Sequence, residues 1–210
     1  MSIPPKITRQ ALMQSHPVIR KLLASFQQTF FDPDYNDAND PAYDALNYPV
    51  DNDALFHGNY ISMMPHGDIR QYPDDLAKKI RSILQELGCQ ELFILAFVKR
   101  DLFGRGLENE KELAQAKGFL KQKLETTSYQ EAIGLHLQEL EVYTFVYFWL
   151  SRLDAELCSY IFWVDEQQRF CFYICNRGNV HWLALHPESG LSEAFFKKHG
   201  LLVGADIDQF

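Results

Sequence analysis

The residues whose type and spacing most suggest chemistry are aspartates, which recur between residues 32 and 53 in a stretch without lysine or arginine. Carboxylates at this density could bind a basic protein, and tyrosine is enriched at protein interfaces. We therefore predict a partner-binding surface for a basic protein, with a solvated loop as the alternative. The residues assigned to this surface are Asp32, Asp34, Tyr35, Asp37, Asp40, Tyr43 and Asp44.

The same stretch offers cation binding as a second chemistry. Asp32-x-Asp34-x-Asn36 matches the first three ligand positions of a calcium loop. The match then ends, because Asp37 stands where such a loop needs glycine and Tyr43 where it needs a bidentate glutamate. We predict neither a metal nor a cofactor for this chain.

Histidine could act as a general base, but the seven histidines are scattered and none shows His-x3-His or His-Glu-x-x-His spacing. His181 and His186 lie near the end of a predicted hairpin. Either could serve a hydrolase-like enzyme if a carboxylate or nucleophile lay beside it. Packed or rim histidines are the alternative that strands of this kind favour.

The cysteines and one glycine loop are further candidates for chemistry. Cys158, Cys171 and Cys175 are expected on one sheet face, with Cys158 opposite Cys175. Inert thiols, a Cys158–Cys175 disulfide, and metal or redox chemistry all remain open, although no zinc knuckle spacing is present. Residues 104–106, Gly-Arg-Gly, end a basic loop over 99–106 and lack both phosphate-loop patterns, so a connecting loop that pairs with the acidic stretch is favoured over phosphate binding.

Composition narrows the class of protein. The net charge of −8 argues against nucleic-acid and anionic-membrane binding, since both need a basic footprint. With 47% hydrophobic residues the chain can bury a sizeable core. Its first residues lack the apolar segment of a signal peptide, and its apolar runs fall far short of the roughly 20 residues of a membrane span. We therefore predict a cytoplasmic protein.

Three predicted strands, Leu157–Val164, Phe170–Asn176 and Val180–His186, organise the fold. Polar breaks join them, and Gly178 suits a turn that needs positive φ. Pairing Val164 with Arg169 and Asn176 with Asn179 predicts a ladder on one face and a second apolar set on the other. The ladder is Tyr160–Tyr173–Trp182, and the opposite face carries Ile161–Phe172–Leu183 and Trp163–Phe170–Leu185. The ladder could stack a ligand or pack beneath the N-terminal helices; a one-residue slip would exchange the faces.

The remaining pattern predicts the elements that must position these residues. Helices are expected after Ser15, after Pro73 up to Gly88, over 109–124, over 142–153 and after Ser189 or Ser192. Strands are expected over 55–64, 92–98 and 133–137. The fold class is α+β: a mainly antiparallel sheet of five or six strands with helices packed on it and an N-terminal helical segment. We predict one domain, with residues 1–53 as helical segment plus acidic loop and 54–210 as the sheet-containing core.

Residues from about 90 to 200 resemble an uncharacterised bacterial domain family. Its pattern is a strand, a long polar helix, a strand, an apolar helix, then a hairpin ending in Tyr-Asp-Asp-Arg-Gly and another strand. Here Cys175-Asn176-Arg177-Gly178 followed by Val180–Leu185 keeps the Arg-Gly and the hydrophobic sequel but neither aspartate. The resemblance implies an architecture and no mechanism.

These observations favour a non-enzymatic cytoplasmic protein-binding module, for instance a bacterial immunity protein that neutralises a basic toxin. Two alternatives belong to other classes. One is the hydrolase-like enzyme that uses His181 or His186, and the other is a small-ligand module that uses the Tyr/Trp ladder.

Overall fold

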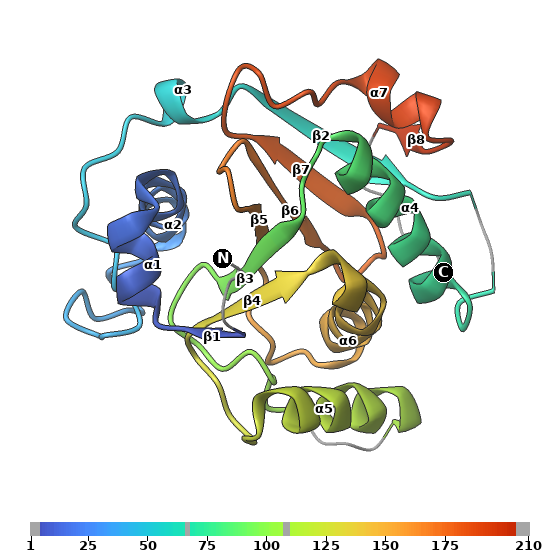
Figure 1. Ribbon diagram of the computed structural model, residues 1–210. Helices are drawn as coiled ribbons and strands as arrows, with labels where there is room; N and C mark the ends of the chain where they lie inside the picture. The colour runs from blue at the N-terminus through green and yellow to red at the C-terminus, as the bar shows by residue number, and fades with distance from the viewer. Residues whose placement is uncertain (1–4, 66–67, 107–109, 205–210) are drawn as a thin grey trace.

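The computed structural model describes residues 5–65, 68–106 and 110–204, without the side chain of Asp53; within these ranges one antiparallel sheet lies between helical layers (Figure 1). The strand order is β1-β4-β3-β5-β6-β7-β2-β8. The strands are β1 (Lys6–Ile7), β2 (Gly58–Met63), β3 (Glu91–Ala96), β4 (Ala132–His136), β5 (Ile161–Asp165), β6 (Phe170–Ile174), β7 (Val180–Ala184) and β8 (Leu202–Val203). The helices are α1 (Arg9–Ser15), α2 (Pro17–Phe30), α3 (Asn52–Leu55), α4 (Tyr72–Glu86), α5 (Lys111–Leu124), η1 (Leu137–Glu139), α6 (Leu140–Leu153) and α7 (Glu193–Lys198).

The mixed α+β class and the antiparallel sheet are confirmed, but the predicted count of five or six strands is wrong. The described residues form eight strands. The two that sequence reasoning missed, β1 and β8, are edge strands of two residues each. A period-two pattern cannot be recognised over two residues, so only their pairing with β4 and β2 defines them as strands.

Helix α4 forms where the sequence pattern placed it. Pro73 lies in its first turn with Asp74 and Asp75, whose carboxylates suit the positive end of a helix dipole. Its apolar stripe is buried, and Gly88 after its end has a φ of +70°. The predicted start of the next helix at Asn109 lies outside the described residues, which resume at the residue before α5.

The N-terminal segment contains two helices where the sequence suggested one. Ser15 was expected to cap a helix, but it is the last residue of α1, and its hydroxyl donates to the Ala11 carbonyl at 2.9 Å. Helix α2 begins directly afterwards at Pro17. Because proline lacks an N–H but suits the first helical turn, the chain can end one helix and begin the next within two residues.

The first hairpin has a different register from the predicted one but the same faces. Val164 pairs with Cys171 rather than with Arg169. The loop has the expected four residues but lies one residue further along the chain, at 166–169, where Gln168 has a φ of +60° and its N–H donates to the Asp165 carbonyl at 2.7 Å. A shift of two residues preserves the side-chain alternation, so the faces of β5 and β6 agree with the prediction.

The second hairpin is displaced by one residue, which overturns the predicted ladder. Tyr173 pairs with His181, and Trp182 pairs with Phe172. The Cys175 N–H donates to the Asn179 carbonyl at 3.0 Å, so this turn is longer than the two-residue turn assumed, although Gly178 has the expected positive φ. A slip of one residue moves every side chain of β7 to the other face. Trp182 therefore lies on the face opposite Tyr160 and Tyr173.

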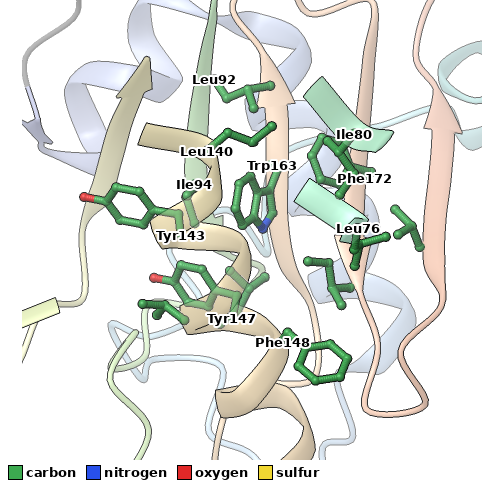
Figure 2. Close-up of a cluster of buried hydrophobic side chains, with 14 of the residues drawn as sticks. Leu76, Ile80, Leu92, Ile94, Leu140, Tyr143, Tyr147, Phe148, Trp163 and Phe172 are labelled. Carbon is green, nitrogen blue, oxygen red and sulfur yellow. The ribbon is translucent and has the colours of Figure 1, made fainter. Parts of the chain in front are cut away.

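Both sheet faces are apolar and both are covered, as expected. Helices α1 and α2 cover one face, where Phe162, Cys171 and Leu183 are buried. On the other face α6 contacts α4 and α5 (Figure 1). Figure 2 shows Trp163 of β5 between side chains of α6 and α4. Leu183 and Leu185 were expected on the face of Trp163, and the one-residue slip places them beneath α2 instead.

Candidate functional site

The acidic loop, residues 32–44, leaves α2 and forms a series of turns closed by its own aspartates. The Oδ1 atom of Asp32 accepts from the Asp34 N–H at 2.9 Å, that of Asp37 from Asn39 at 2.8 Å, and that of Asp40 from Ala42 at 2.8 Å. Side-chain acceptors of this kind substitute for backbone hydrogen bonds and order a loop. The loop is therefore preorganised, and each of these carboxylates retains acceptor capacity.

Asp44 anchors the loop to the sheet. Both of its oxygens accept from the guanidinium of Arg9 at 2.8 Å, and that arginine side chain is 1% exposed. The remaining Arg9 nitrogen donates to the Ala96 carbonyl at 2.6 Å, at the end of β3. Gln27 adds a bond to Asp44 at 3.1 Å. Asp44 was expected to contact a partner, but its charge is already neutralised within the chain.

The structure divides the seven predicted residues into two groups. Asp32, Asp34, Tyr35 and Asp37 are exposed, and Tyr35 reaches 87% exposure. The other three are partly occupied: Asp44 as described, Asp40 by Arg100 at 3.8 Å, and Tyr43, which donates to Asn36 at 2.6 Å and packs against Phe31. A role for these residues in binding remains a prediction.

Negative charge at the exposed part of the acidic loop is not offset by nearby cations. Asp32, Asp34 and Asp37 form no ion pair with a lysine or arginine in the described ranges. Helix α2 ends beside them with no basic residue in its last turn. Because the C-terminus of a helix carries a partial negative charge, the helix adds to the potential of the three carboxylates.

The predicted Tyr/Trp ladder is replaced by a pocket under α2. We call it the aromatic pocket; it has a volume of about 470 Å³ and walls formed by Phe26, Phe30, Phe56, Tyr160, Tyr173 and Leu183. Two members of the ladder, Tyr160 and Tyr173, thus line a cavity together. Trp182 does not, since it is fully buried on the other face and donates to Ser62 at 2.8 Å.

The two candidate histidines are not brought together. His181 is 8% exposed, and its ring stacks on Tyr173 with centroids 4.5 Å apart. His186 is exposed beyond β7, and its Nδ1 accepts from the Glu188 N–H at 3.1 Å. His181 shares a cavity of about 290 Å³ with Asp154. That carboxylate is committed elsewhere, because it pairs with Lys117 at 3.2 Å.

The Gly-Arg-Gly loop already encloses an anion of its own chain. The Gly106 N–H donates to both oxygens of Asp154, at 2.9 and 2.8 Å, and Lys117 closes the group by donating to the Gly106 carbonyl at 2.6 Å. A Cβ atom at Gly104, where φ is +67°, would clash with the same carboxylate. The loop thus holds a carboxylate where a phosphate loop would hold its ligand. The basic loop over 99–106 does contact the acidic stretch, as predicted: Arg100 pairs with Asp40 at 3.8 Å, and the Lys99 N–H donates to the Ala42 carbonyl at 2.8 Å.

A potential metal-binding group that sequence reasoning missed lies at the opposite end of β5. Among the described residues, Cys89, Asp165 and Glu166 bring their ligand atoms within 4.8 Å of one another. Arg169 binds both oxygens of Asp165, at 2.7 and 2.9 Å, and the Cys89 thiol donates to Glu166 at 3.4 Å. Burial raises the pKa of Cys89 well above its usual range, which opposes formation of the thiolate that a metal needs. The Arg169–Asp165 ion pair and the hydrogen bond from the Cys89 thiol to Glu166 explain why these side chains lie together without a metal. The sequence did not predict this group because Cys89 lies far along the chain from Asp165 and Glu166.

The four cysteines are free, so Cys158 and Cys175 are not joined. Cys89 and Cys171 are 0% exposed, and burial raises the pKa of both thiols. We expect the native protein to react with a thiol-specific disulfide reagent much more slowly at these two positions than the urea-unfolded protein does. Mass spectrometry of the labelled protein measures this. Fewer than four reactive thiols in urea without reductant would instead indicate a disulfide.

Comparison of the chain with models of known protein families, with curated proteins and with solved structures finds no match. Within the described ranges, every helix is too short or too polar to span a bilayer.

Proposed function

We propose that this protein is a non-enzymatic binding module that engages a basic protein partner through the exposed part of its acidic loop. An immunity protein that neutralises a basic toxin in the bacterial cytoplasm is the specific form of this proposal. The observation that carries it is the exposure of Tyr35, which is 87% exposed among Asp32, Asp34 and Asp37. An exposed aromatic side chain among unneutralised carboxylates combines an interface anchor with electrostatic steering.

The internal bonds of the loop support the proposal. Turns closed by aspartate side chains, together with the Arg9–Asp44 anchor, hold the exposed groups in place before binding. A preorganised loop loses less conformational freedom on association, so more of its contact energy appears as affinity. The hydrolase-like alternative receives less support, since the carboxylate that shares a cavity with His181 is bound to Lys117.

The test uses a lysine-rich peptide as a defined basic probe. We expect the triple variant Asp32→Asn/Asp34→Asn/Asp37→Asn to bind it about tenfold more weakly, because three exposed ion pairs of roughly 0.5 kcal/mol each are lost. Isothermal titration calorimetry at low and physiological salt measures the change.

A control with the same change in net charge separates a site from diffuse attraction. Glu110, Glu125 and Glu188 are exposed and lie outside the acidic loop. The Glu→Gln triple at these positions should retain affinity within about twofold, since its lost charges act only at long range through screening salt. An equal loss in both triple variants would show that net charge alone drives binding and would contradict the proposal.

A further inference from the structure

The aromatic pocket begins where the acidic loop begins. Phe30 is the last residue of α2, lines the pocket and is 46% exposed. Asp32 follows two residues later, so the chain separates their Cα atoms by at most about 7 Å. An apolar cavity and the exposed carboxylates therefore meet at the end of one helix.

The walls of the pocket are held by ring contacts. Phe30 stacks on Tyr160 with centroids 4.9 Å apart, and Tyr160 meets Tyr173 edge-on at 5.2 Å. Tyr173 in turn stacks on His181, which is 8% exposed. Each ring is braced by the next, so the cavity exists before a ligand arrives. Preformed apolar cavities of this size are typical of binding sites.

The lining has no charged side chain among the described residues. Besides the apolar walls it contains Ser25, Thr29, Asn52 and Asn59. A lysine or arginine inside would lose hydration without a carboxylate partner, which is costly. An apolar or aromatic side chain would gain transfer free energy by leaving water for this pocket. Cationic residues next to that side chain in the partner would lie near Asp32 and Asp34.

We propose that the aromatic pocket receives an aromatic side chain of the basic partner, flanked in the partner by lysine or arginine residues that pair with the acidic loop. This inference rests on the proposed function and specifies the partner's chemistry. The loop accelerates encounter and orients the partner, while the buried ring slows dissociation.

The experiment compares two peptides that differ at one position. Each has two lysines on either side of a glycine-flanked central residue, which is phenylalanine in one peptide and alanine in the other. We expect the phenylalanine peptide to bind about tenfold more tightly, from burial of its ring. In NMR titrations, the resonances of Phe30 and Tyr173 should shift with the phenylalanine peptide and not with the alanine peptide. The resonances of residues 32–37 should shift with both peptides.

Two variants test the pocket itself. Phe30→Ser removes a wall of the aromatic pocket, and Asn59→Trp on β2 fills the pocket while all its walls remain. Each variant should reduce the ratio of the affinities for the two peptides to less than about twofold. Leu202→Ser is the matched control, because Leu202 is 55% exposed and does not line the pocket. It should leave the tenfold difference unchanged.

The outcomes distinguish the two proposals. Equal affinity for both peptides, with residues 32–37 shifted by each, would overturn the pocket inference and leave the proposed function standing. The absence of any shift at residues 32–37 would overturn the proposed function. Tight binding of the phenylalanine peptide that is insensitive to the Asp→Asn triple would show an apolar site independent of the loop, and so would overturn the inference of one bipartite surface.

Discussion

Replacing Arg9 with leucine is expected to lower the free energy of unfolding by about 3–5 kcal/mol, the cost of breaking a buried ion pair. The guanidinium is 1% exposed and binds both oxygens of Asp44 and the carbonyl of Ala96. Leucine fills part of the space but leaves the carboxylate and the carbonyl without these donors. Urea denaturation followed by circular dichroism measures the loss.

A second arginine of the same region provides the control. Arg100 also pairs with an aspartate of the acidic loop, but at 3.8 Å and with 47% of its side chain exposed. Arg100→Leu should therefore cost no more than about 1 kcal/mol, as exposed pairs do. Similar losses in the two variants would mean that the Arg9–Asp44 pair does not anchor the loop in the way proposed.

Truncation of Trp163 to alanine is expected to destabilise the protein by a comparable amount, about 3–5 kcal/mol. This ring is 0% exposed at the centre of the sheet, stacks on Phe172 at 5.4 Å and meets Tyr147 of α6 edge-on at 5.9 Å (Figure 2). The helices that cover it are fixed by their own packing, so the cavity cannot fully collapse. Thermal and urea unfolding both measure the effect.

Tyr35→Ala is the matched aromatic control for Trp163. Since Tyr35 is 87% exposed, its removal should change the free energy of unfolding by less than about 0.5 kcal/mol. The proposed function predicts that the same variant binds the lysine-rich peptide more weakly. A large loss of stability in Tyr35→Ala would indicate that the residue is structural and would weaken its assignment to an interface.

Local sequence signals identified the elements with strong internal patterns. Helix α4 has proline and two aspartates in its first turn and glycine after its end, and the three hairpin strands are apolar runs separated by polar breaks. Helix α7 begins after Ser192, whose Oγ accepts from the Phe195 N–H at 3.1 Å. In these cases the information lies within a few neighbouring residues, where a sequence pattern can express it.

Register could not be obtained in the same way. The second turn forms a bond from the Cys175 N–H to the Asn179 carbonyl, which a two-residue turn does not contain. The competing registers bury similar numbers of side chains, because all five residues of β7 are buried, on either face. Hydrophobic alternation normally selects a register by distinguishing a buried face from a solvent-exposed face, and β7 has no exposed face.

The sequence by itself determined the composition of the acidic loop, the α+β class, and which residues form most helices and strands, because these depend on local composition and spacing. Tertiary structure alone decided that Asp44 meets Arg9, that Cys89 lies beside Glu166, and that Tyr160 and Tyr173 share a pocket with Phe30 while Trp182 faces away. These relations join residues distant in sequence, and a displacement of one residue along a strand is enough to reverse them.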